Sequence, residues 1–157
     1  MLDENHRWDL FDTDVDIIAH QVNCMGVMGS GVAAQVKALF PDVYVRYRTV
    51  CREIRPQNLL GMTQTVLIRG EEAKPFAIAN LFAQLSFGRD KQQTNYAALE
   101  SCLRDLANEM RRRGFRSVAV PYMMGCVRGG GDWNKVLNLL ERELKDFDVL
   151  ICRKDKG

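Results

Sequence analysis

Two continuous apolar runs place the strongest limit on how this chain can fold. Residues 16–22 read DIIAHQV, and residues 76–82 read FAIANLF. Apolar runs of this length without polar alternation are typical of strands that are buried on both faces of a sheet. Residues 31–40 and 94–113 follow with apolar side chains at helical spacing. A sheet of this kind needs helices packed on both faces, so we expect an α/β protein.

The rest of the chain continues the alternation of strands and helices. We expect a short helix at 42–51, a strand at 63–68, a turn at 69–72, a strand at 117–120, a helix at 132–145 and a strand at 148–152. The order predicts a three-layer α/β/α sandwich with a mixed or largely parallel central sheet. A length of 157 residues suits one domain spanning 1–157.

Composition excludes several classes of protein. Hydrophobic residues make up 46% of the chain and charged residues 27%, which is typical of a globular protein. The formal net charge of +2 is too small to indicate a nucleic-acid or membrane partner by charge alone. No apolar run approaches the roughly 20 residues of a membrane span, and the stretch MLDENHRWDL lacks the apolar segment of a secretory signal. We expect a cytoplasmic protein that does not enter a membrane.

The cysteines favour free thiols. They number five, at Cys24, Cys51, Cys102, Cys126 and Cys152, and no two form a C-x-x-C pair. An odd number without paired spacing argues against a disulfide framework and against a zinc site. No cluster of His, Cys and carboxylate residues has the spacing of metal ligands, so we expect neither a metal nor another cofactor.

Two glycine-rich stretches each follow an expected strand and precede an expected helix. The first lies within HQVNCMGVMGSGVAAQV at 20–36, and the second is GCVRGGGDW at 125–133. The amino end of a helix attracts anions, and glycine lets a phosphate approach the backbone. Each stretch alone also fits a tight turn. Two of them at the same edge of a sheet would suit a diphosphate.

Known phosphate motifs do not account for these stretches. A Walker A loop would need Lys and then Ser or Thr where Val32 and Ala33 stand. A phosphatase of the C-x5-R type would need arginine where Ser30 and Asp132 stand. Residues 29–34 match G-x-G-x-x-A, but the acid at the matching distance, Glu53, falls in an expected helix or loop.

Polar residues near the first stretch allow two interpretations each. Gln21 fits a hydrogen-bond network that holds the loop, and Asn23 fits recognition of ligand hydroxyls. His20 is either a core histidine or a titratable group close to the chemistry. Asp9 is either a surface acid or an acceptor for an exocyclic amine, and Asp132 is placed to cap the last helix.

Taken together, three segments resemble the macrodomain family. They are WDLFDTDVDIIAHQVNCMGVMGSGVAAQVKALFP, IANLFAQLSFGRD with TNYAAL, and VAVPYMMGCVRGGGDW. The chain is similar in particular to the bacterial and phage branch of ADP-ribose 1″-phosphate processing proteins. The resemblance covers nearly the whole chain and implies one macrodomain sandwich that binds ADP-ribose.

The resemblance also implies the positions that contact ADP-ribose. Asp9 would bind the adenine amine with Leu10 beside it, and Asn23 would bind the distal ribose. The first glycine loop would line the diphosphate and the distal ribose, and the second would close over the phosphates. The implied contacts are Asp9, Leu10, Gln21, Asn23, Gly26, Val27, Met28, Gly29, Ser30, Gly31, Val32, Tyr122, Met124, Gly125, Cys126, Val127, Arg128, Gly129 and Gly130.

Branches of the family differ in chemistry. Glycohydrolases of ADP-ribosylated substrates use a lysine after the middle strand and an aspartate in the second glycine loop. Here residues 81–85 contain no lysine, and Gly129 aligns with that aspartate. The phosphatase branch carries a histidine at the position of His20, so resemblance favours hydrolysis of ADP-ribose 1″-phosphate by His20, with Asp132 as a second acid or base.

Three other functions stay open at this point. The chain could be an ADP-ribose reader without turnover, or an ADP-ribosyl hydrolase that acts on a modified macromolecule. Nucleic acid is expected only as such an ADP-ribosylated substrate, and binding through the basic run Arg111–Arg113 is a remote alternative. The sequence does not indicate an oligomeric state.

Overall fold

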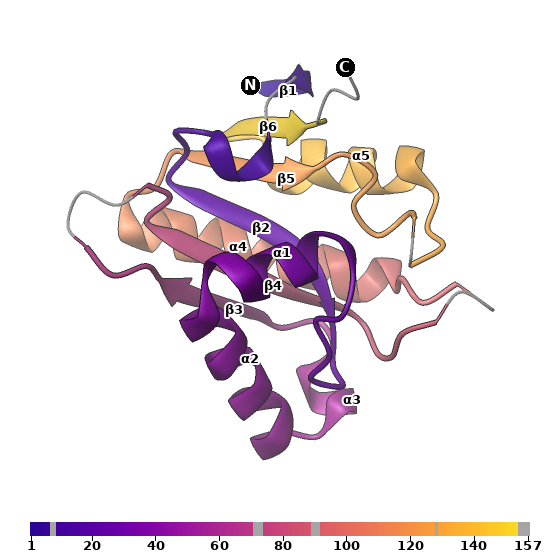
Figure 1. Ribbon diagram of the computed structural model, residues 1–157. Coiled ribbons are helices and arrows are strands. Elements are labelled where there is room, and N and C mark those ends of the chain that lie inside the picture. Colours follow the sequence, from indigo (N-terminus) through magenta and orange to yellow (C-terminus); the bar gives the residue numbers. More distant parts are fainter. Residues whose placement is uncertain (7–8, 71–73, 89–91, 128, 154–157) are drawn as a thin grey trace.

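A six-stranded sheet runs through the centre of the computed structural model (Figure 1). The structure describes residues 1–6, 9–70, 74–88, 92–127 and 129–153. The strand order is β1-β6-β5-β2-β4-β3, and only β3 is antiparallel to its neighbour. The strands are β1 (Leu2–His6), β2 (Ile17–Asn23), β3 (Thr63–Leu67), β4 (Ala77–Gln84), β5 (Ser117–Pro121) and β6 (Asp148–Cys152).

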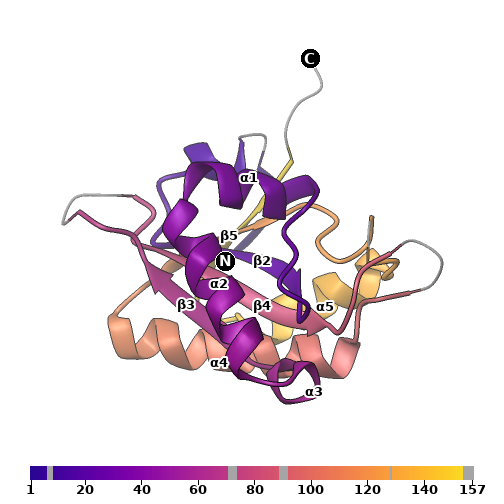
Figure 2. The same ribbon diagram turned by 60° about the horizontal axis from the view of Figure 1, so that its bottom comes forward.

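Helices cover both faces of the sheet, as the apolar runs require. Figures 1 and 2 show α1 and α2 on one side and α4 and α5 on the other. The helices are α1 (Gly31–Leu39), α2 (Pro41–Glu53), α3 (Pro56–Leu59), α4 (Tyr96–Arg113) and α5 (Trp133–Glu143), with a 3-10 turn η1 (Leu10–Asp12). The expected α/β/α sandwich with a mixed sheet is confirmed.

Alternate residues of β2 enter two separate cores. Ile17 and Ala19 pack with α4 and α5, whereas Ile18 and Val22 pack beneath α1 and α2. Both faces of this central strand are therefore buried, which explains its almost continuous apolar sequence. The same burial extends along β4, where every residue before Gln84 is buried.

The ends of the long helices follow local chemistry. Gly114 adopts a left-handed φ of +73° and ends α4, as its position after the last helical residue predicts. Asp132 caps α5, where its carboxylate accepts a hydrogen bond from the Asn134 amide at 2.9 Å. The capping role expected for Asp132 is confirmed.

Three elements were not expected from the sequence: β1, α3 and the 3-10 turn η1. Strand β1 lies at the sheet edge beside β6, and α3 is a single turn that begins at Pro56. The segment that forms β1 has no apolar run, and its pairing partner lies more than 140 residues away in the sequence. Among the described residues, no helix combines the length and apolar character needed to cross a membrane.

Candidate functional site

The parallel order of the strands brings the two glycine loops to one edge of the sheet. Strands β2 and β5 are adjacent and parallel, and the loops at 24–30 and 122–132 leave their carboxyl ends. The segment after β4 reaches the same edge, because the Cys24 amide donates to the Leu85 carbonyl at 3.1 Å. This edge is where ligands bind in open α/β sheets.

Asn23 holds the first glycine loop in shape. Its side-chain oxygen accepts hydrogen bonds from the Met25 amide at 3.0 Å and from the Tyr47 hydroxyl at 2.8 Å. Its side-chain nitrogen donates to the Val27 carbonyl at 2.8 Å. The Asn23 amide is thus largely occupied by the loop and by α2, and its contact with a distal ribose stays a prediction. Sequence reasoning missed Tyr47, whose phenol is buried among apolar residues.

The first loop opens α1 without a side-chain cap. Ser30 is the residue before the helix, and its hydroxyl forms no capping hydrogen bond. The first amides of α1, starting at Gly31, therefore keep their donor groups and the positive end of the helix dipole for an anion. Val27 is exposed, whereas the Met28 side chain is buried in the core, so Met28 presents only its backbone to this edge.

A partly buried polar network fixes the second glycine loop from behind. The Gln21 amide donates to Gln84 Oε1 and to Thr94 Oγ1, both at 2.8 Å. The Thr94 hydroxyl in turn donates to the Gly125 carbonyl at 2.6 Å. Gln21 takes part in a hydrogen-bond network as expected, but the network holds the second glycine loop rather than the first, and Gln21 Oε1 is buried without a partner. The two partners of the Gln21 amide nitrogen were not foreseen from the sequence.

Gly129 completes this contact from the other side of the loop. Its carbonyl accepts hydrogen bonds from the Gln93 amide at 2.6 Å and from the Thr94 amide at 3.0 Å. A Cβ atom at Gly129 would collide with Thr94 Oγ1 and would lie 2.6 Å from the Gly125 carbonyl oxygen. A Cβ atom at Gly125 would likewise lie only 2.6 Å from Gln21 Oε1. These two glycines are required by close packing behind the loop.

Replacing Thr94 by valine tests this network. The change keeps the shape of the side chain but removes one hydrogen bond from the Gly125 carbonyl and one from the Gln21 amide, which keep only Gly131 and Gln84 as partners. We expect a loss of about 1–3 kcal/mol in the free energy of unfolding. Thermal or urea unfolding measures the loss, and Thr94→Ser, which keeps the hydroxyl, should restore most of it. Equal stability of Thr94→Val and the wild type would contradict the network.

His20 lies inside the protein, beneath α2. It is 1% exposed, and its Nε2 is 2.7 Å from Asn80 Oδ1. Asn80 Nδ2 donates to Gln64 Oε1, and Gln64 Nε2 donates to the Arg46 carbonyl of α2. Because Asn80 uses its nitrogen in this way, its oxygen is the acceptor, and the His20 proton is on Nε2.

Burial sets the charge of this histidine. It lowers the pKa of His20 to about 4, and the hydrogen bond that His20 donates to Asn80 offsets the shift only in part. His20 is therefore neutral at pH 7. Its Nδ1 atom is buried and has no hydrogen-bond partner. The interpretation as a core histidine fits this position, and a direct catalytic contact stays a prediction.

Asp132 is an exposed carboxylate where the second loop enters α5. Its amide donates to the Tyr96 hydroxyl at 2.8 Å, and one carboxylate oxygen caps the helix. Replacing Asp132 by asparagine removes the charge and keeps the cap, because the two residues are comparable N-caps. We expect unchanged thermal stability for Asp132→Asn, and a loss of about 1 kcal/mol for Asp132→Ala. Any loss of turnover in Asp132→Asn then reports on the carboxylate alone.

The remaining expected contacts fall into three groups. Leu10 and Met124 are buried, and the Asp9 carboxylate caps η1 by accepting the Phe11 amide at 3.0 Å. Val127 is 67% exposed, and Arg128 lies outside the described residues. Tyr122 packs edge-on against Trp133, and its other contact is the Arg153 guanidinium, 3.6 Å from the ring centre.

None of the cysteines is activated. Burial and, to a lesser extent, the nearby Asp132 charge raise the pKa of Cys126 to about 11. Burial also raises the pKa of Cys24, Cys102 and Cys152 to about 12. Such thiols are protonated at neutral pH and are poor nucleophiles. Among the described residues, no three His, Cys, Asp or Glu side chains gather in a way that could hold a metal ion.

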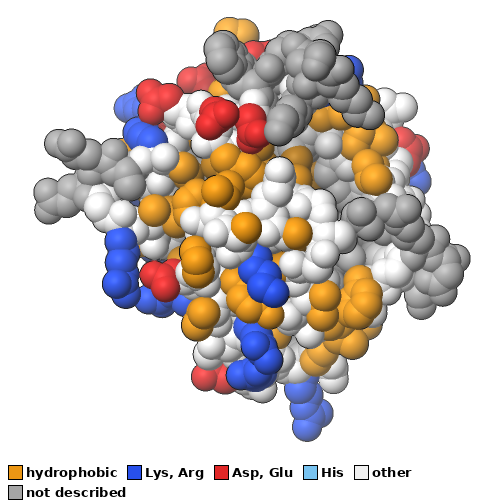
Figure 3. All heavy atoms as spheres, viewed as in Figure 1, with side chains coloured by type: hydrophobic (Ala, Val, Ile, Leu, Met, Phe, Trp, Pro, Cys, Tyr) orange, Lys and Arg blue, Asp and Glu red, His pale blue; other side chains and the backbone are white. Residues whose placement is uncertain are grey.

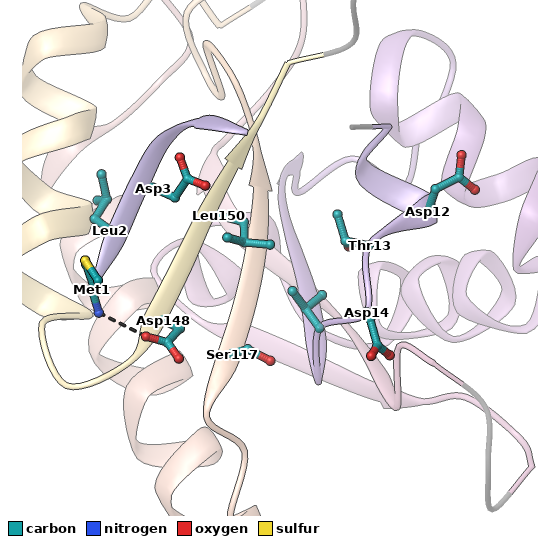
Figure 4. A pocket seen from close by; sticks show the side chains of 10 residues that line it. Met1, Leu2, Asp3, Asp12, Thr13, Asp14, Ser117, Asp148 and Leu150 are labelled. Atoms are coloured by element: carbon teal, nitrogen blue, oxygen red, sulfur yellow. Dashed lines mark hydrogen bonds and ion pairs between the residues drawn. The ribbon is translucent and has the colours of Figure 1, made fainter. Parts of the chain in front are cut away.

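A cleft of about 800 Å³ lies away from the glycine loops (Figure 4). It opens at the amino ends of β5 and β6, and Leu150 and Ser117 are among its lining residues. Four aspartates, at positions 3, 12, 14 and 148, also line it. Their charge repels a diphosphate, so this cleft does not compete with the loop edge as a site for an anionic ligand.

Comparison with known proteins places this fold and loop arrangement in a family. The model of the macro domain matches residues 19–140, and the chain belongs to the macrodomain family. The chain is 31% identical over 152 residues to a Mycobacterium tuberculosis protein named DNA ADP-ribosyl glycohydrolase, covering 95% of this chain and 41% of that protein. The chain thus spans about two fifths of that relative's length.

Two further relatives bear on the site. An ADP-ribose 1″-phosphate phosphatase of Meyerozyma guilliermondii is 36% identical over 89 residues, half of each chain. A solved structure of Thermosipho africanus DarTG in complex with ADP-ribose superposes with a TM-score of 0.77 at 26% identity, covering 95% of this chain and 41% of that chain. Both relatives agree with the resemblance seen in the sequence.

Proposed function

We propose that this protein binds ADP-ribose between its two glycine loops and hydrolyses a bond at the distal ribose of an ADP-ribose derivative. The observation that carries the proposal is the uncapped amino end of α1 at the same edge of the sheet as the second loop, which Thr94 and Gly129 hold in place. The two loops leave adjacent parallel strands, so their amides converge on one diphosphate. The complex of a DarTG relative with ADP-ribose supports this choice of ligand.

The substrate we favour is an ADP-ribosylated macromolecule. Exposed apolar side chains stand on all three segments around the site: Met25, Val27, Leu85, Phe87 and Val127. Apolar groups exposed around a ligand site are typical of a surface that contacts a further partner. The relative that matches 95% of the chain is named for hydrolysis of ADP-ribosylated DNA, whereas the phosphatase relative matches half of it.

The chemistry assigned to the residues follows from their exposure. His20 is buried and neutral, so we propose that it positions β2 and the loop after it through Asn80. The exposed Asp132 carboxylate is the candidate general base that activates water at the distal ribose. Residues 81–85 contain no lysine, so direct attack by water fits this chain better than a covalent lysine intermediate. Loop amides stabilise the diphosphate and the charge that develops beside it.

Calorimetric titration with ADP-ribose, run beside two turnover assays, tests the proposal. Micromolar binding corresponds to about −8 kcal/mol and is the expected result. The assays follow release of ADP-ribose from an ADP-ribosylated oligonucleotide and release of phosphate from ADP-ribose 1″-phosphate. Turnover of the first substrate, lost in Asp132→Asn with binding retained, supports the proposal.

Each other outcome selects a different function. Phosphate release alone would return the assignment to the phosphatase suggested by the sequence resemblance. Binding without turnover of either substrate would make the protein a reader of ADP-ribose. Absence of binding would refute the assigned site.

A further inference from the structure

Helix α2 and the turn that follows it carry four arginines without an acidic partner. Arg46, Arg48, Arg52 and Arg55 are exposed, and none of them forms an ion pair within the described parts of the chain. Segment 41–55 also holds two acids, Asp42 and Glu53. Asp42 is already paired with Arg69 at 3.6 Å. The segment therefore presents a net positive surface. Figure 3 shows Lys and Arg side chains in a broken line over this helix.

The basic run Arg111–Arg113 of α4 differs from these arginines, because its side chains form ion pairs. Arg111 pairs with Asp146 at 3.2 Å, and Arg112 and Arg113 both pair with Glu109. Each of these arginines has an acidic partner, and the two carboxylates offset most of the charge of the run. The remote expectation of nucleic-acid binding at Arg111–Arg113 therefore receives no support from their environment. The unpaired cations are on the opposite face of the sheet.

The unpaired arginines lie beside the first glycine loop. Tyr47 of α2 donates from its hydroxyl to the Asn23 carbonyl at 2.8 Å, and a Cβ at Gly26 would lie 3.6 Å from Cys51 Cβ. Arg48 and Arg52 each follow one of these contact residues. Arg48 and Arg52 are four residues apart and share one side of α2, and Arg55 follows in the extended turn between α2 and α3. We refer to these three arginines as the row Arg48–Arg52–Arg55. The helix dipole favours Arg52 in the last turn, but it accounts for neither Arg48 nor Arg55.

We propose that the row Arg48–Arg52–Arg55 binds the phosphate backbone of a nucleic-acid strand whose ADP-ribosyl group occupies the glycine-loop site. This inference rests on the proposed function and names its substrate class and the surface that holds it. Guanidinium groups bind phosphate oxygens in pairs, and unpaired arginines are free to do so. Phe87, 54% exposed on the segment joined to Cys24, offers a ring on which a base can stack.

Binding of an unmodified, fluorescently labelled single-stranded DNA of about 20 nucleotides tests the surface without ADP-ribose. Fluorescence anisotropy at several salt concentrations gives the affinity and its salt dependence. For the variant Arg48→Gln/Arg52→Gln/Arg55→Gln, loss of three phosphate contacts should lower the slope of log affinity against log salt by about 2. Affinity at low salt should fall by about tenfold or more.

The variant Arg111→Gln/Arg112→Gln/Arg113→Gln is the matched control, because it removes the same charge from paired arginines. Its DNA affinity should stay within about twofold of the wild type. Thermal melts check that both variants fold, and calorimetry with ADP-ribose should give unchanged affinity for both. Equal loss of DNA binding in both variants would contradict the proposal that the row Arg48–Arg52–Arg55 binds the DNA backbone. Wild-type binding without salt dependence would also contradict it. If the row binds DNA but the protein does not bind ADP-ribose, the DNA-binding surface is supported and the proposed function is refuted.

Discussion

Gly129→Ala should unfold the second glycine loop and cost about 3 kcal/mol or more in the free energy of unfolding. The added methyl group would collide with Thr94 Oγ1 and would press on the Gly125 carbonyl oxygen. Thr94 Oγ1 can move away from the methyl group only by giving up its hydrogen bond to the Gly125 carbonyl, which is 2.6 Å long. Relief of the clash would break the contact that positions the loop, so ADP-ribose binding should be lost with stability.

Urea unfolding and calorimetry with ADP-ribose measure the two effects. Gly29→Ala is the matched control in the first glycine loop, because a Cβ there would meet only Val27 Cγ1, at an ordinary 3.5 Å. Its stability should stay within about 1 kcal/mol of the wild type. If Gly129→Ala were as stable as Gly29→Ala, the packing between Thr94 and the second loop would be refuted.

The same packing bears on the catalytic residues. The resemblance to glycohydrolases aligns an aspartate of that branch with Gly129, and this position has no room for any side chain. A carboxylate therefore cannot stand there without rearrangement of the loop. Asp132, three residues further along the chain, is the carboxylate that the fold offers to this edge of the sheet.

Lowering the pH from 7 to 4 should remove about 3 kcal/mol of stability through His20 alone. The pKa of His20 is about 4 in the folded protein and near 6.5 in the unfolded chain. Between these values the unfolded chain binds a proton that the folded protein does not. Stability contributed by neutral His20 is therefore complete above pH 6.5 and is lost as the pH falls toward 4. About 2 kcal/mol should be gone by pH 5.

His20→Asn isolates this effect from other titrating groups. Asparagine can donate to Asn80 Oδ1, but it has no charge to gain in this range. The free energy of unfolding, measured in urea at pH 7, 6 and 5, should fall more steeply for the wild type than for His20→Asn. Parallel curves would show that His20 is protonated in the folded protein, which contradicts its burial beneath α2. Comparing slopes removes any constant cost of the substitution.

The elements that sequence reasoning located depend on neighbouring residues. Strand β2 shows in a continuous apolar run, and α4 shows in apolar side chains at helical spacing. Gly114 and Asp132 mark helix ends because a left-handed residue and a capping carboxylate act within a few residues of their own position. The same local chemistry places a glycine loop before α1 and another before α5.

The residues that hold the site together could not be found in this way. Thr94 is an ordinary residue in the sequence, and its role depends on Gln21 and Gly125, which are far from it along the chain. The basic run on α4 looks free until the fold brings Asp146 beside Arg111. The pairing of Glu109 with Arg112 and Arg113 follows from helical spacing, but the pairing of Arg111 with Asp146 depends on the fold.

By itself, the sequence determined the α/β order of this protein, the burial of its central strands and the family to which its glycine loops belong. The spacing of buried residues, the capping of helices and the placing of loop glycines each depend on a few neighbouring positions, so the order of residues reveals them. Only the tertiary structure decided which glycine position has no room for a side chain, that His20 is neutral and enclosed, and which arginines stay unpaired. Those properties depend on atoms brought together from distant parts of the chain, through packing, desolvation and charge pairing that exist only after folding.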